Sequence, residues 1–307
     1  MISRYIKEFG IKLFAVNGIT RLLSKLHIPV KGYGFKKHRI DEAYLLKKYR
    51  NCLTSDFNFL TVDFSAPKRI YVFWWDGEET APETVKVCIE SIKRCNSLET
   101  VVLTKDNYAE YVQLPDYIVE KVKSGTMGLA HFSDVLRFAL LYKYGGIWMD
   151  ATCFQLKETP NEILEKEFYS LNGVFDSSDS IDWKWTSFYM AGKPGNIVCK
   201  GMLSFYFDYW REHSEALTYL ILDCWMTVLY ENNSEINAII DSVEKSDNSI
   251  FLLNEIANNP MDASAAEAIK TKTFFQKVTY KVDYYPEKDG QLTNWGYITN
   301  HELRETK

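Results

Sequence analysis

The sequence predicts an α/β fold, built as a single Rossmann-type domain with a mainly parallel central sheet and preceded by an N-terminal helical extension. The first observation is that short apolar runs, typical of buried strands, alternate with longer amphipathic patterns, typical of helices. The second is that Gly and Pro stand at the joints between them. The order strand, helix, strand, helix, strand favours parallel strands with right-handed crossovers. The predicted strands cover residues 69–75, 100–103 and 147–150, and the predicted helices cover 82–95 and 129–144.

The first strand is the clearest of these elements. Residues 69–75 read RIYVFWW, a β-branched and aromatic run that fits a strand buried on both faces. In parallel sheets, ligands bind beyond the carboxyl ends of the strands. Trp75, Asp76 and Asp150 fall at the ends of two predicted strands. We therefore expect a binding site at this edge of the sheet.

The second half of the chain is less regular. A strand is expected over 183–191, with Ser187 inside it, before the turn signal of residues 192–195. The remaining patterns predict helices over 196–212, 215–231 and 262–270 and a strand over 273–282.

Charge divides the chain into two parts. Residues 1–50 hold twelve Lys or Arg against Glu8, Asp41 and Glu42, a net charge of +9, so the whole-chain value of −5 leaves −14 for residues 51–307. The acidic body argues against nucleic acid as a partner. The basic head favours an anionic membrane surface. We expect a helical extension over 1–66 and one domain over 67–307.

The head also carries an apolar stripe at helical spacing, which has two interpretations. Either it packs on the body of the protein, or it lies in a membrane interface. The stripe consists of Ile2, Tyr5, Ile6, Phe9, Leu13 and Val16.

Cysteine usage and hydropathy predict a location in the reducing cytoplasm, and the basic head adds peripheral association with the inner face of the cell membrane. The six cysteines form no CxxC pair, so no zinc or redox motif is visible. No run approaches 18 apolar residues, and basic residues interrupt the first apolar stretch too early for a signal peptide.

The stretch LAHFSDVLRFALLYKYGGIWMDATCF, residues 129–154, carries most of the chemistry. Asp134 and Arg137 are three residues apart and share one helix face. An arginine fork can bind a phosphate through two parallel hydrogen bonds. Asp150 then stands at a strand end, where a metal–diphosphate or a ribose could be bound. An isolated Asp–Arg pair is usually a surface salt bridge, but this combination favours a binding role.

These residues resemble known families. SDVLRFALLYKYGGIWMDAT is similar to the sugar-nucleotide signature of family 32 glycosyltransferases and of the large clostridial toxin glucosyltransferases, in which a Y-G-G turn leads to Asp-x-Asp. GGIWMDAT, together with FWWDGEETAPETVKVCIESI upstream, more closely resembles the bacterial capsular polysaccharide synthesis glycosyltransferases, which carry Asp-Ala-Thr. The resemblance covers residues 67–160 well and 183–282 in patches. It implies a GT-A-like fold and a nucleotide-sugar donor, with UDP as the expected nucleotide.

The resemblance also implies roles for individual residues. Asp134 and Arg137 would contact the transferred sugar and its phosphate, and Asp150 would hold the ribose or a metal. Asp223, in TYLILDCW, would face the reaction centre and is the best candidate for a catalytic carboxylate. The further donor-binding candidates are Phe73, Trp74, Trp75, Ser187, Lys277 and Lys281, and Gln276 is a candidate metal ligand.

Two positions leave the metal open. Thr152 stands where the broader superfamily has the second acidic residue of Asp-x-Asp, and Gln276 stands where His is expected. Mn²⁺ and Mg²⁺ prefer hard oxygen ligands, so the loss of a carboxylate weakens such a site. The related families retain anomeric configuration, through either a carboxylate nucleophile or a front-face mechanism. The acceptor is expected to be a saccharide, lipid-linked at the membrane. The alternative is a catalytically impaired module that binds nucleotide-sugar or glycan.

Overall fold

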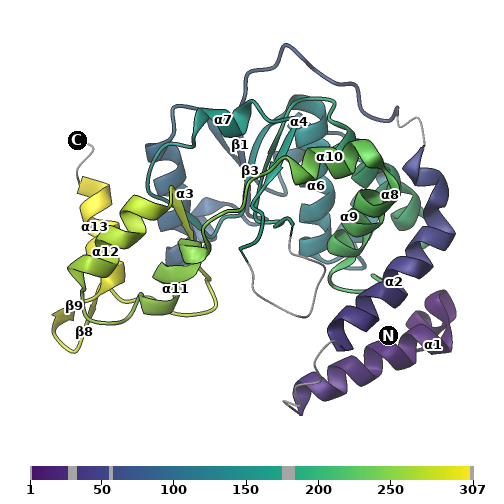
Figure 1. Ribbon diagram of the computed structural model, residues 1–307, viewed down its shortest axis with the longest axis horizontal. Coiled ribbons are helices and arrows are strands. Elements are labelled where there is room, and N and C mark those ends of the chain that lie inside the picture. The colour runs from purple at the N-terminus through teal and green to yellow at the C-terminus, as the bar shows by residue number, and fades with distance from the viewer. Residues whose placement is uncertain (1, 27–32, 55–57, 175–183, 305–307) are drawn as a thin grey trace.

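The computed structural model describes residues 2–26, 33–54, 58–174 and 184–304 (Figure 1). Helices lie on both sides of a central sheet, and the α1–α2 pair and the α11–α13 group lie at opposite ends of the molecule (Figure 1). The strands are β1 (Ile70–Phe73), β2 (Thr100–Leu103), β3 (Gly146–Met149), β4 (Cys153–Gln155), β5 (Phe168–Ser170), β6 (Tyr189–Gly192), β7 (Phe275–Lys277), β8 (Glu287–Lys288) and β9 (Gln291–Leu292). The helices are α1 (Ile2–Lys25), α2 (Tyr33–Tyr49), η1 (Arg50–Leu53), η2 (Glu78–Thr80), α3 (Glu83–Cys95), α4 (Tyr108–Tyr111), α5 (Asp116–Lys123), α6 (Leu129–Tyr144), α7 (Asn161–Leu164), α8 (Ile197–Glu212), α9 (Ile221–Asn232), α10 (Ser234–Asp241), η3 (Asn248–Phe251), α11 (Leu252–Ile256), α12 (Ala263–Lys272) and α13 (Asn294–Arg304).

The central sheet confirms the predicted α/β class with a mainly parallel sheet. Its strand order is β2-β1-β3-β6-β5, with β1 parallel to both β2 and β3. Only β6 runs against the other strands of this sheet, pairing antiparallel with β3 and with β5. A separate pair, β4 with β7, extends from the end of β3. The carboxyl ends of β1 and β3 therefore meet at one edge.

The two faces of the sheet carry different helices. Tyr71 packs into the larger core that contains residues of α6, α8 and α9. Its neighbours Ile70 and Val72 point the other way and pack with Val85 and Ile89 of α3. This alternation follows from the two-residue repeat of a strand, and it explains why β1 is apolar throughout.

The observed helix and strand boundaries agree closely with the predicted ones in the first half of the chain and less closely in the second half. The predicted helices over 82–95 and 129–144 are α3 and α6. The strand expected over 69–75 ends at Phe73, so Trp74 and Trp75 belong to the loop beyond it. The helix expected over 215–231 begins only at Ile221. The strands expected over 183–191 and 273–282 are the shorter β6 and β7, and residue 183 of the former lies outside the described chain.

The described part of the N-terminal apolar stripe packs on the body of the protein, and the side chain of Ile2 lies outside the described residues. Phe9 and Leu13 are buried in the main core, and the ring of Phe9 stacks on His213, with centroids 4.8 Å apart. The Tyr5 hydroxyl donates a hydrogen bond of 2.7 Å to the carbonyl oxygen of Leu217. Among the described residues, no helix has the length and hydropathy needed to cross a bilayer.

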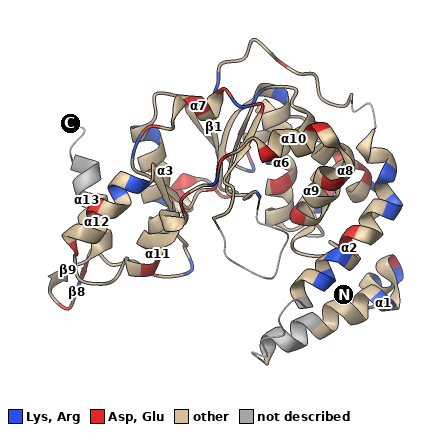
Figure 2. Ribbon diagram, in the orientation of Figure 1, with Lys and Arg blue, Asp and Glu red and all other residues tan. Residues whose placement is uncertain are grey.

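Part of the basic charge in this part of the chain is paired. Figure 2 shows Lys and Arg along α2, beside acidic residues of α8 and α9. Arg39 lies 2.6 Å from the Glu231 carboxylate, and Lys48 lies 2.9 Å from that of Glu212. The +9 head and the −14 body are therefore joined by ion pairs across their interface.

The turn between α6 and β3 requires glycine. Gly145 caps α6, with φ of +67°, and Gly146 follows, with φ of +95°. The Ile147 amide then donates to the Arg69 carbonyl oxygen at 2.9 Å, which starts the pairing of β3 with β1. A Cβ at position 146 would lie 2.4 Å from that same oxygen. The close approach of these strands thus depends on the absence of a side chain.

Gly146→Ala is expected to lower the free energy of unfolding by more than about 2 kcal/mol, because it combines strained backbone with a clash against main-chain atoms. Gly18→Ala is the matched control, since Gly18 is exposed in α1 with no atom within 4 Å of an added Cβ. That control should gain about 0.5–1 kcal/mol from helix propensity. Urea unfolding followed by circular dichroism measures both. An unchanged midpoint for Gly146→Ala would contradict the strain argument.

Candidate functional site

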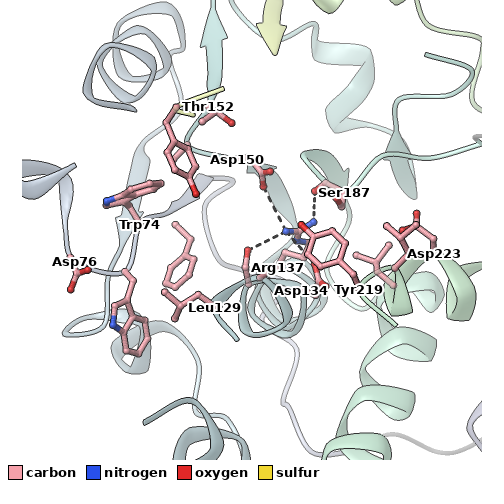
Figure 3. Close-up of a pocket in the computed structure, with 18 residues that line it drawn as sticks. Trp74, Asp76, Leu129, Asp134, Arg137, Asp150, Thr152, Ser187, Tyr219 and Asp223 are labelled. Carbon is pink, nitrogen blue, oxygen red and sulfur yellow. Dashed lines mark hydrogen bonds and ion pairs between the residues drawn. The ribbon is translucent and has the colours of Figure 1, made fainter. Parts of the chain in front are cut away.

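A cavity of about 480 Å³ opens where β1 and β3 end. Figure 3 shows its walls: the segment after β1 on one side, the N-terminal half of α6 below, and the segment before α9 on the other side. The cavity gathers most of the residues that the sequence singled out. Its lining comprises Phe73, Trp74, Trp75, Asp76, Leu129, Ala130, Ser133, Asp134, Arg137, Asp150, Ala151, Thr152, Ser187, Tyr219, Leu220, Leu222, Asp223 and Tyr280.

Arg137 lies at the floor of the cavity and is almost fully buried. One terminal nitrogen donates to the main-chain oxygen of Ser187. The other lies 3.3 Å from Asp134 Oδ1 and 3.6 Å from Asp150 Oδ1 (Figure 3). The guanidinium carbon is 5.1 Å from the centre of the Trp148 ring. Arg137 is thus a shared cation that fixes two carboxylates at the cavity floor.

Asp150 is placed by the end of β3. Its amide donates to the Phe188 carbonyl oxygen at 2.9 Å, and its Oδ1 accepts a 3.1 Å hydrogen bond from the indole nitrogen of Trp148. About a third of the side chain remains exposed, at 32%. The carboxylate can therefore accept further hydrogen bonds from a ligand in the cavity.

Asp223 faces the same cavity from the first turn of α9 (Figure 3). Its Oδ1 accepts a 3.1 Å hydrogen bond from the indole nitrogen of Trp185. Burial raises the pKa of Asp223 to about 6, with a further upward contribution from the charge of Asp134, while the Trp185 hydrogen bond and Arg137 act in the opposite direction. A carboxyl group with this pKa changes protonation close to neutral pH.

Aromatic side chains form the upper walls. Phe73 and Trp75 pack edge-on against Phe132, with centroids 5.7 and 5.8 Å apart. Trp74 and Tyr280 meet edge to face at 5.3 Å. Flat apolar faces of this kind stack with nucleobases and sugars.

Two wall residues, Tyr219 and Tyr280, were not among the predicted site residues. Tyr219 is 76% exposed at the cavity mouth, and Tyr280 is 46% exposed. Both lie close in sequence to predicted site residues, since Tyr219 is four residues before Asp223 and Tyr280 directly precedes Lys281, and an aromatic residue beside a candidate polar residue was the signal that could have found them.

The candidates from β7 are placed differently from one another. Lys277 donates a hydrogen bond to the hydroxyl of Thr152, a cavity residue. Gln276 is fully buried, its amide group bonded to the Leu253 amide and to the Ser249 carbonyl oxygen. Neighbouring residues of a strand point to opposite faces, so the two cannot both reach the cavity. Lys281 is exposed, and Lys277, Gln276 and Lys281 are all absent from the cavity lining, so Lys277 is connected to the cavity only through Thr152.

The side chains near Asp150 do not form a set that suits a divalent metal. Asp134 and Asp150 share the Arg137 guanidinium, and the Thr152 oxygen accepts from an ammonium group. Gln276, the other candidate ligand, is bonded elsewhere. Mg²⁺ and Mn²⁺ prefer hard oxygen donors, and cations already lie beside Oδ1 of each carboxylate and beside the Thr152 hydroxyl.

The family model and a curated relative agree with the resemblance seen in the sequence. An O-glycosyltransferase, braB, of Annulohypoxylon truncatum is 26% identical over 162 residues, which cover 48% of this chain and 38% of the fungal protein. The chain thus spans little more than a third of that relative. Among solved structures, the PaToxG glycosyltransferase aligns with a TM-score of 0.41 and 14% identity over 78% of this chain and 95% of its own. The profile described as capsular polysaccharide synthesis protein matches residues 29–294, which is most of the chain, and the protein therefore belongs to the capsular polysaccharide synthesis protein family.

Proposed function

We propose that this protein is a glycosyltransferase with a GT-A-like domain, which moves a sugar from a UDP-sugar to a saccharide acceptor during surface-polysaccharide synthesis. The observation that carries the proposal is the cavity at the ends of β1 and β3, with aromatic walls above a floor of two carboxylates around one arginine. Membership of the capsular polysaccharide synthesis family and the name of the fungal relative support it.

The two sides of the cavity suit the two ends of a nucleotide-sugar. The nucleobase would lie against the segment after β1, where Phe73, Trp74 and Trp75 offer ring faces and main-chain groups. The sugar would lie over α6, where Asp134 can accept hydrogen bonds from its hydroxyls. Asp150, between the two sides, would hold the ribose. This orientation brings the transferred sugar next to Asp223.

In the reaction, the bond between C1 of the sugar and the diphosphate oxygen breaks, and its electron pair goes to that oxygen. The acceptor oxygen forms the new bond to C1 and gives up its proton. We expect retention of configuration. Asp223 is the candidate nucleophile if a covalent intermediate forms, because a retaining displacement needs a carboxylate beneath C1. In a front-face reaction the departing diphosphate takes the acceptor proton, and Asp223 positions the acceptor.

A catalytically impaired binding module is the second candidate. It is favoured by Thr152, which stands where a second acidic residue is expected. Such a module would bind UDP or a UDP-sugar and release no product. Mass-spectrometric detection of free UDP, with a panel of UDP-sugars, separates the two functions.

The donor site makes a direct prediction. UDP should bind the full-length protein in calorimetry, and Asp150→Asn should weaken binding about tenfold or more, because the site loses a charged acceptor. Asp208→Asn is the control, since Asp208 pairs with Arg211 on the surface of α8, outside the cavity. Equal affinities for all three proteins would show that the nucleotide binds elsewhere.

The pKa of Asp223 makes a second prediction, for the pH profile of UDP release. The carboxylate form predominates above pH 6, so kcat should fall as the pH drops through about 6, where the group gains a proton. Asp223→Asn should lower kcat strongly and abolish this acid limb. A wild-type profile that stays flat down to pH 5 would exclude a required Asp223 carboxylate.

We also propose that residues 1–66 form an extension that docks the catalytic domain, 67–307, on the cytoplasmic leaflet, near a lipid-linked acceptor. The buried stripe of α1 is unavailable for this role, but α1 exposes Ile11 (64%) and Ile19 (47%). Lys7 and Lys12 of the same element are also exposed. Each basic group near an anionic surface contributes about 1 kcal/mol, screened over roughly 10 Å.

Full-length protein should therefore co-sediment with anionic vesicles at low salt and dissociate as salt rises. Replacing Ile11 and Ile19 by Glu should weaken binding without unfolding, whereas Leu292→Glu, exposed in β9 at the far end of the molecule, should not. Point variants are preferable to truncation because Phe9 and Leu13 belong to the core. Unchanged sedimentation of the double variant would refute docking through α1.

A further inference from the structure

Lys277 is held beside the end of β3 by backbone pairing. In the β4–β7 ladder it stands opposite Cys153, and the next amide, of Val278, donates to the Thr152 carbonyl oxygen at 3.0 Å. The segment from Asp150 to Cys153 is itself closed by a 2.9 Å hydrogen bond from the Cys153 amide to the Asp150 carbonyl oxygen. The position of the lysine relative to the cavity is therefore fixed by the main chain.

The ammonium group of Lys277 has neutral partners. It donates to the hydroxyl oxygen of Thr152 and to the carbonyl oxygen of Val278, and it lies 5.4 Å from the centre of the Phe188 ring. Within the described parts of the chain, no carboxylate lies within salt-bridge distance of it. Lys277 thus brings one uncompensated positive charge to the back of the cavity wall that Thr152 forms.

The hydroxyl of Thr152 connects this charge to the cavity. Its oxygen accepts from the ammonium, which leaves its own O–H free to donate into the cavity. A hydroxyl polarised in this way is a stronger donor to an anion. Thr152 and Lys277 together therefore put a positive charge one hydroxyl group behind the cavity wall, near the end of β3.

We infer that Lys277, acting with Thr152, supplies the positive charge that stabilises the diphosphate of the donor, so that donor binding requires no divalent metal. The inference rests on the proposed function and specifies its leaving-group site. As the bond from C1 to the diphosphate oxygen breaks, the electron pair that moves to that oxygen is stabilised by the Thr152 O–H and the Lys277 charge. The charge of Arg137 is already paired with the Asp134 and Asp150 carboxylates, so Lys277 is the cation available to stabilise the diphosphate.

The test is calorimetric titration of the full-length protein with UDP, once in excess EDTA and once in excess MnCl₂. The wild type should bind with the same affinity in both. Lys277→Met should weaken UDP binding in EDTA about ten- to hundredfold, and Lys277→Arg should restore most of the loss. Lys272→Met, which removes an exposed lysine at the end of α12, is the matched control and should bind as the wild type does.

A double variant, Thr152→Asp with Lys277→Met, makes the test sharper because it exchanges the ammonium for a second carboxylate. It should bind UDP weakly in EDTA and regain affinity with Mn²⁺. Thermal melting of each variant, without nucleotide, identifies loss of folding. Wild-type binding that appears only with Mn²⁺ would overturn the inference and leave the proposed function intact. Absence of UDP binding under both conditions would overturn both.

Discussion

The buried guanidinium of Arg137 ties together three segments that are distant in sequence. It contacts Asp134 on its own helix, Asp150 at the end of β3, and the main chain at Ser187, just before β6. A charge removed from water is tolerable only when it is paired and hydrogen-bonded. Loss of one partner from such a buried pair costs about 3–5 kcal/mol. The cavity floor is therefore a structural requirement as well as a chemical surface, and the two roles cannot be separated by position alone.

The direction of the strands in the central sheet places the cavity beside Arg137. Gly145 and Gly146 let α6 turn sharply into β3, and β3 can then pair with β1 at close range. Because β1 and β3 are parallel, Trp75 and Asp150, which follow these strands, lie at the same edge of the sheet. The antiparallel β6 returns beside β3 and brings Ser187 to the other side of Asp150. The site is thus a direct product of strand direction.

The N-terminal helices take part in this construction from outside the sheet. Lys37 of α2 is buried, pairs with Asp41 at 2.7 Å and also donates to the Thr218 hydroxyl at 2.9 Å. Thr218 immediately precedes Tyr219 on the cavity wall. Nearby, burial raises the pKa of Glu42 to about 7, although Arg39 acts to lower it. The basic extension thereby supports the segment that carries Tyr219 and Asp223.

Local pattern in the sequence determined the α/β class, the limits of α3 and α6, and the grouping of Asp134, Arg137 and Asp150. Helical periodicity, glycine at helix ends and apolar runs are properties of neighbouring residues, so one sequence is enough to recognise them. The aromatic residues that follow β1 could be predicted as part of the site for the same reason.

Tertiary structure decided what depends on pairing over long distances. Thr152 and Lys277 meet only because β7 returns to β4, and the same pairing turns Gln276 into the interior. Phe9 and Leu13 form an apolar stripe that fits a membrane or a protein equally well, and only contact with α8 and its neighbours assigned it to the core. Which surface an apolar stripe or a strand face contacts depends on segments distant in sequence, and periodicity along one segment carries no information about those segments.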